Sequence, residues 1–134
     1  TVYFQTYNLD KKTISQITNE DPFNFLDKEL ILRKKNNLPP YERFISIILT
    51  SKNEKKLEKE ALQLRSHLFN KINGKVLGPV SASIYKIKKQ YRNRLLIRSK
   101  KTSNIQKSLA SALKNFKFSS EIKLTVDVDP ISFN

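Results

Sequence analysis

Eight cations and no acid lie within the stretch YKIKKQYRNRLLIRSKK, residues 85–101. A lysine ammonium group meets phosphate as a point charge, and an arginine guanidinium group binds it as a two-pronged hydrogen-bond donor. The stretch therefore predicts a surface that contacts the phosphate groups of a nucleic acid. The predicted contact residues are Lys86, Lys88, Lys89, Arg92, Arg94, Arg98, Lys100 and Lys101.

Two tyrosines, Tyr85 and Tyr91, accompany these cations. Stacking on unpaired bases is one role for aromatic rings beside a basic surface. Packing in the core or at a sheet edge is the alternative, and it is the commoner one. The sequence shows no set of side chains that would read base edges, so we expect binding that follows the structure of the nucleic acid or is non-specific.

The net charge of +14 is unevenly distributed. Residues 1–30 hold three cations and five acids, a balance of −2, so residues 31–134 carry +16. This distribution favours a polyanionic partner, with nucleic acid ahead of an anionic membrane, because neutralised phosphates release counterions. A protein encoded by an AT-rich genome would also carry many lysines on any solvated surface. Such a genome explains arginine less well, and three of the six arginines lie within residues 85–101.

The sequence offers little for metal or nucleophilic chemistry. It has no cysteine and one histidine, His67, which we interpret as a surface residue. Asp127 and Asp129 could offer oxygen ligands to Mg²⁺ or Ca²⁺, but we expect a structural cap or an ion pair instead. Residues 74–79 (GKVLGP) lack the spacing of a phosphate-binding loop. We therefore predict no catalytic residue, no metal site and no cofactor in this chain.

Hydrophobic spacing predicts alternating strands and helices. Apolar residues repeat every three or four positions in residues 51–72 and 103–115, as in helices with one buried face. The isoleucine-rich run RFISIILT at residues 43–50 predicts a strand. In full, the predicted strands are residues 2–7, 43–50, 83–88, 91–99 and 121–128, and the predicted helices are residues 22–36, 51–72 and 103–115.

From residue 43 the predicted order is βαββαβ, which favours a ferredoxin-like α+β fold. Such a split βαβ sandwich has four antiparallel strands with both helices on one face. Residues 1–40 would be an appendage with a strand and a helix, and residues 41–134 the globular domain.

Strand alternation decides which way the basic stretch faces. Tyr85, Ile87, Leu95 and Ile97 should face the helices, which sends the cations of the same strands to the open face. The simplest alternative is an ordinary solvated sheet face. We favour a partner because no acid lies between Glu60 and Glu121 to neutralise the charge. The cations expected on the open face are Lys86, Lys88, Arg92, Arg94 and Arg98.

Five short motifs together resemble one known family. They are QTYN (5–8), ELILRKKNNLPPY (29–41), VLGPVSA (76–82), YRNRLLI (91–97) and DVDPISF (127–133). In this order and spacing they resemble the C-terminal end of the primosomal protein N′ family, the bacterial replication-restart helicases. The resemblance covers essentially the whole chain.

The resemblance implies that the chain is a piece of a longer protein. Residues 1–40 would be the end of the second helicase lobe with a linking helix, and residues 41–134 a C-terminal domain that assists DNA binding. The parent would be an ATP-dependent 3′-to-5′ DNA helicase that uses ATP, Mg²⁺ and Zn²⁺, none bound by this piece. The implied partners are branched or single-stranded DNA, single-stranded DNA-binding protein and other primosome proteins. We expect a cytoplasmic monomer with no membrane partner.

A protein-docking module is the main alternative function. Family members receive the acidic tail of single-stranded DNA-binding protein between this domain and the helicase core. Gln106 matches a polar position of that site, whereas the nearby basic position is Thr102 here. A phosphatase reading based on Arg92 and Asn93 is disfavoured because neighbours on a strand point to opposite faces.

Overall fold

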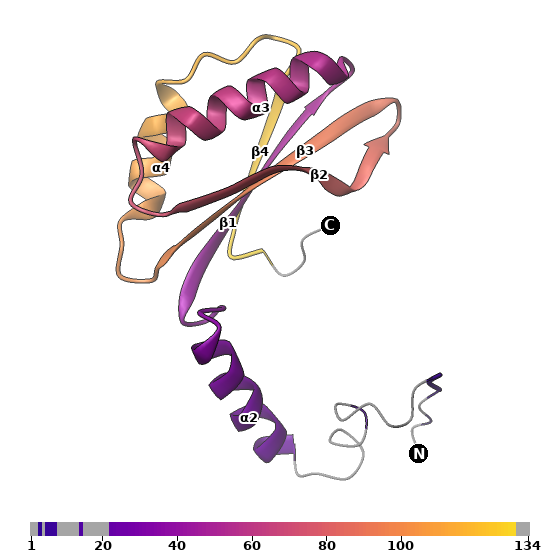
Figure 1. Ribbon diagram of the computed structural model, residues 1–134, viewed down its shortest axis with the longest axis vertical. Helices are drawn as coiled ribbons and strands as arrows, with labels where there is room; N and C mark the ends of the chain where they lie inside the picture. Colours follow the sequence, from indigo (N-terminus) through magenta and orange to yellow (C-terminus); the bar gives the residue numbers. More distant parts are fainter. Residues whose placement is uncertain (1–2, 4, 8–13, 15–21, 131–134) are drawn as a thin grey trace. The chain divides into compact units, whose positions relative to one another are not determined.

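The computed structural model describes Tyr3, residues 5–7, Ile14 and residues 22–130 (Figure 1). The chain divides into two compact units, Thr1–Leu38 and Pro39–Asn134. The strand predicted at residues 2–7 lies partly outside the described residues. Tyr3 and residues 5–7 are not in a strand.

The first unit contains helix α2 (Pro22–Lys35), one residue shorter than predicted. Proline is well placed at the first helical position, where its missing N–H leaves no bond unmade. Arg33 and Lys34 stand in the last turn, where cations complement the negative end of the helix dipole. The Nε of Arg33 donates to Glu29 one turn earlier, at 2.8 Å. These local interactions support the helix.

The second unit is a four-stranded antiparallel sheet with two helices on one side (Figure 1). The strand order β2-β3-β1-β4 places the first strand between the third and the fourth. This is the order of the ferredoxin-like split βαβ fold, so the predicted fold class is confirmed. The elements are β1 (Glu42–Ser51), α3 (Glu54–Phe69), β2 (Lys75–Ile87), β3 (Gln90–Lys100), α4 (Ile105–Lys114) and β4 (Lys123–Val128).

The core lies between the sheet and its helices. Ile45, Ile47 and Leu49 of β1 are fully buried, as their alternation predicts, and they pack with Leu95 and Ile97 of β3. Burying one such side chain contributes about 1.5–3 kcal/mol, so this layer supplies much of the stability. The helices fill the opposite side of the layer with Leu57, Ala61, Leu64, Leu68, Ile105, Leu109 and Ala112.

The largest difference from the predicted elements is the start of β2, at Lys75 instead of residue 83. Gly78 adopts a φ of +94°, and a β-carbon there would meet the backbone oxygen of Arg94 at 2.7 Å. Only glycine fits this position without strain. Pro79 is tolerated because β2 is an edge strand and its pairing with β3 shifts register after Leu77. The glycine and proline thus shape the strand without ending it.

Candidate functional site

The three arginines of β3 lie on the side of the sheet away from α3 and α4, which we call the open side. Along β3 every second residue is buried, from Asn93 to Ser99, and these residues face the helices. Arg92, Arg94 and Arg98 occupy the alternate positions and are half-buried. The predicted direction of these three side chains is confirmed.

Arg98 has an acidic partner that the sequence analysis did not find. Its Nε donates to the carboxylate of Glu42 on β1, in an ion pair in which both side chains are largely buried. Glu42 lies opposite Lys100 in the β1–β3 register, so the carboxylate sits among the cations at this end of the sheet. The expectation that the whole basic stretch lacks neutralising acids was therefore wrong at Arg98.

Asp129 provides a second acid at the same end of the sheet. Its Oδ2 lies 3.2 Å from the Nε of Arg43, and its Oδ1 accepts a hydrogen bond from the backbone N–H of Phe44 at 3.3 Å. These contacts agree with the predicted structural cap, whereas the ion-pair partner, Arg43, lies outside the basic stretch of residues 85–101. A small hollow beside the pair is lined by Glu42 and Lys101 among others. Lys101 thus lies close to both acids.

The described residues include no cluster of three or more histidine, cysteine, aspartate or glutamate side chains placed to hold a metal ion. Asp127 is exposed on the open side, opposite Ser46 of β1. The carboxylate of Asp129, by contrast, contacts Arg43 and the backbone of Phe44.

Lys86 does not face the direction that simple alternation predicts. The pairing of β2 with β3 is irregular between Ser81 and Lys86, and beyond the irregularity Lys86 lies opposite Tyr91. Its Nζ sits 4.6 Å from the centre of the Tyr91 ring and donates to the tyrosine hydroxyl at 3.2 Å. The prediction that Lys86 joins Arg92 on the open side was therefore wrong.

Both tyrosines of the basic stretch have partners within the protein. The rings of Tyr85 and Tyr91 meet edge to face at 5.5 Å, and Tyr91 packs against the core. The hydroxyl of Tyr85 donates to Glu54 at the start of α3, and this hydrogen bond raises the pKa of Tyr85 to about 12. These contacts agree with the packing role, and base stacking by either ring stays a prediction.

Lys88 and Lys89 form the two-residue turn between β2 and β3, and both are exposed. Their φ angles are 48° and 63°, as in the type I′ turn that matches the twist of a hairpin. Asparagine and glycine are the usual residues there, because positive φ is unfavourable for a side chain as long as lysine. The chain thus places two cations at the hairpin tip despite their poor fit to the turn.

The middle of the open side is more apolar than the sequence analysis expected. Leu77 and Val80 of β2 are about half exposed, and the register places them opposite Leu96 and Arg94. Ile48 lies on the other side of Arg94, in the β1–β3 pairing. The alternation of β1 was used to predict only the residues that face the helices. Ile48 was missed for that reason, and Leu77 and Val80 were missed because the predicted strand began only at residue 83.

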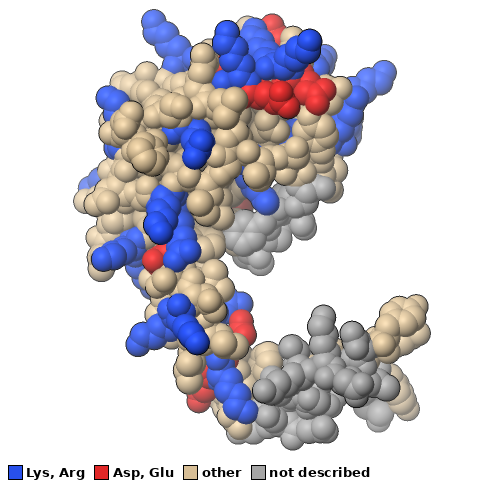
Figure 2. All heavy atoms as spheres, in the orientation of Figure 1, with Lys and Arg blue, Asp and Glu red and all other residues tan. Residues whose placement is uncertain are grey.

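Positive side chains predominate on the surface seen in Figure 2, where Lys and Arg clearly outnumber Asp and Glu. Residues 34–131 match the family described as Primosomal protein N C-terminal domain. The chain belongs to this family. The resemblance drawn from the five motifs is therefore confirmed.

Curated relatives agree with the match to the primosomal protein N C-terminal domain family. The chain is 36% identical over 132 residues to the Replication restart protein PriA of Rickettsia felis, an alignment that covers 98% of this chain and 20% of that protein. It is 31% identical over 133 residues to the protein of the same name from Borreliella burgdorferi, again covering 98% of this chain and 20% of the relative. The chain thus spans about one fifth of the length of these relatives.

Within this primosomal family domain, Gln106 is exposed in the first turn of α4. An open groove of about 430 Å³ runs beside the same helix. The groove is lined by Lys71, Lys107, Ser108, Ser111, Ala112 and Asn115.

No helix in the described part of the chain is long and apolar enough to cross a membrane.

His67 is more than the surface residue that the sequence suggested. It is half-buried between α3 and α4, with its Nε2 at 3.0 Å from the carbonyl oxygen of Ala112. Its ring also meets Phe116 edge to face at 5.3 Å. His67 therefore joins the two helices.

Proposed function

We propose that residues 39–134 form a DNA-binding accessory domain of a replication-restart helicase. Its open side would contact the phosphate backbone of forked or single-stranded DNA. The proposal rests mainly on one observation, the placement of Arg92 and Arg94 on the side of β3 that faces away from both helices. Arg98 lies on the same side but is paired with Glu42. Guanidinium groups held by a rigid sheet suit phosphate contact because little conformational freedom is lost on binding.

The charge of the chain supports this proposal. A net charge of +14 on 134 residues attracts a polyanion over a distance, and the release of counterions from phosphate adds affinity. The relatives are named as replication restart proteins, which agrees with a DNA partner. The helicase activity and its ATP, Mg²⁺ and Zn²⁺ are proposed for the longer protein and for no residue of this chain.

Fluorescence anisotropy tests the proposal. The 134-residue chain is titrated onto a labelled fork and a matching single strand over a series of salt concentrations. The variant R92Q/R94Q/R98Q should bind at least about tenfold more weakly, and its salt slope should fall by about one for each arginine that contacts a phosphate.

A matched variant controls for simple loss of charge. K55Q/K59Q/R65Q also removes three cations, but all three lie exposed on α3, on the other side of the sheet. Its affinity should stay within about twofold of the parent chain. Equal losses in the two variants would reduce the proposal to general attraction, and no loss in the open-side variant would refute it. Circular dichroism of each variant checks that the fold is kept.

A second candidate is the docking of an acidic peptide, such as the tail of single-stranded DNA-binding protein. The groove beside α4 favours it, because Lys71 and Lys107 line that groove and no acid does within the described residues. K71Q/K107Q and Q106A should then weaken binding of a labelled acidic peptide and leave DNA affinity unchanged. The opposite pattern would remove this candidate.

A further inference from the structure

The cations of the second unit are not equivalent, because the described ion pairs of Glu42 and Asp129 lie at one end of the sheet. At the end where β1 begins, Glu42 pairs with Arg98 and Asp129 pairs with Arg43. At the opposite end, where β1 finishes and the β2–β3 turn lies, Arg92 donates a long hydrogen bond of 3.5 Å to the carbonyl oxygen of Ile84, and no carboxylate of the described residues pairs with it. Positive charge that is free to meet an anion is therefore concentrated at the turn end.

A hollow of about 190 Å³ lies at this turn end. Three cations line it from three different segments: Lys88 from the turn, Arg92 from β3 and Lys123 from β4. No carboxylate lines it within the described part of the chain. Its other lining residues are Thr50, Ile87, Gln90 and Thr125.

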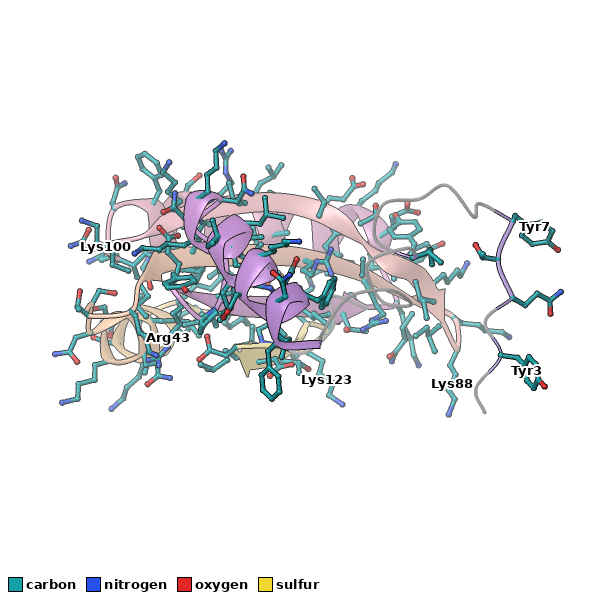
Figure 3. The ribbon with its side chains drawn as sticks, turned by 90° about the horizontal axis from the view of Figure 1, so that it is seen from below. Tyr3, Tyr7, Arg43, Lys88, Lys100 and Lys123 are labelled. Carbon is teal, nitrogen blue, oxygen red and sulfur yellow. The ribbon has the colours of Figure 1, made fainter. Side chains whose placement is uncertain are left out.

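The register explains how this set converges. Thr50 of β1 lies directly opposite Arg92 on one side and directly opposite Lys123 on the other. Two strand spacings separate the outer pair by roughly 10 Å between their Cα atoms, so both long side chains can bring their charged ends above the small threonine between them. Figure 3 shows Lys88 and Lys123 extending from the same side of the molecule. The hydroxyl of Thr50 is a further donor at the centre.

We infer that this hollow holds one backbone phosphate of the DNA, with Arg92 and Lys123 as its charged contacts and Thr50 as its neutral donor. The inference rests on the proposed function and places the DNA path at the turn end of the sheet. A guanidinium group and an ammonium group on either side of one hydroxyl donor suit an oxyanion with several acceptor oxygens. The hollow has one aliphatic side chain, Ile87, and so offers little to the side chains of a peptide.

Two charge-matched double variants of the 134-residue chain test the inference. R92Q/K123Q removes two cations from the hollow, and K100Q/K101Q removes two exposed cations from the end where Glu42 and Asp129 lie. The first should weaken binding to a labelled oligothymidylate about tenfold and lower the salt slope by about 0.7, the value for loss of one phosphate contact on a single strand. The second should change affinity less than about twofold.

A third variant separates a formed site from net charge. T50V keeps the charge and the approximate shape of the side chain but removes the hydroxyl. It should weaken binding about threefold without changing the salt slope, because a neutral donor releases no counterion.

The possible outcomes distinguish the inference from the proposed function. Equal losses in the two doubles, with T50V unchanged, would overturn the phosphate site and leave DNA binding by the open side intact. If R92Q/R94Q/R98Q also bound normally, the proposed function itself would fail. Loss of acidic-peptide binding in R92Q/K123Q, with DNA binding kept, would assign the hollow to a peptide and also overturn the inference.

Discussion

Glu42 of β1 and Arg98 of β3 form an ion pair on the open side of the sheet, although 56 residues separate them in the chain. Both side chains are largely buried, so removing one partner leaves a charge that is only partly hydrated. This arrangement assigns Arg98 to the stability of the fold. Arg92, six residues earlier in β3 and without a carboxylate partner in the described residues, is available to a ligand.

We predict opposite phenotypes for these two arginines. R98M should lower the free energy of unfolding by about 1–3 kcal/mol and leave DNA affinity nearly unchanged. R92M should change stability by no more than about 0.5 kcal/mol and weaken DNA binding severalfold. Urea unfolding followed by circular dichroism gives the first quantity and fluorescence anisotropy the second. Weaker DNA binding by a stably folded R98M would show that the ion pair opens to admit phosphate.

Tyr85 gives a prediction about pH. Its hydroxyl donates to Glu54 only while the tyrosine is neutral, and this raises the pKa of Tyr85 from 10.0 to about 12. Because the folded pKa exceeds the unfolded one, the stabilisation is complete below about pH 10 and is lost as the pH rises towards 12. Ultraviolet titration should show one of the five tyrosines ionising late. Y85F should remove that late step and leave the others in place.

A second variant tests the cause of the Tyr85 shift. In E54Q the partner is no longer charged, so the late ionisation should move back towards pH 10. Y91F is the control, because it removes the neighbouring hydroxyl and leaves the hydrogen bond between Tyr85 and Glu54 in place. If the late step survived in E54Q, burial of the phenol, and not the carboxylate, would be its cause.

The fold was predictable where the pattern is local. The alternation of Ile45, Ile47 and Leu49 and the helical spacing of Leu57, Ala61 and Leu64 depend on near neighbours alone, and these residues are buried as expected. The start of β2 was missed because glycine and proline normally argue against a strand. An edge position and a register shift allow both residues here, and these are properties of the assembled sheet.

The candidate site was less predictable because it depends on contacts between distant segments. The direction of Arg92 and Arg94 follows from alternation within one strand. The neutralisation of Arg98 by Glu42 and the reversal of Lys86 beside Tyr91 depend on strand register, which the sequence did not reveal. The same reason explains why Lys123 was not predicted as a contact, although it shares a hollow with Arg92.

His67 offers a test of the contact between α3 and α4. H67A removes the contact with the carbonyl oxygen of Ala112 and the edge-to-face contact with Phe116. We expect a loss of about 1–2 kcal/mol in the free energy of unfolding. Q63A, at an exposed position of the same helix, should cost less than about 0.5 kcal/mol. Equal stability of the two variants would mean that the His67 contacts contribute nothing net.

The hairpin tip offers a prediction that separates stability from binding. Lys88 and Lys89 both adopt positive φ, where asparagine and glycine fit better. K88N and K89G should each raise the free energy of unfolding by about 0.5–1 kcal/mol, because less strain is held in the folded turn. Of these two lysines, Lys88 lines the hollow at the turn end and Lys89 does not. K88N should therefore weaken DNA binding while K89G leaves it nearly unchanged, as measured by urea unfolding and anisotropy on the same samples. A K88N variant that gained stability and kept full affinity would show that Lys88 does not contact phosphate, and its poor fit to the turn would then need another explanation.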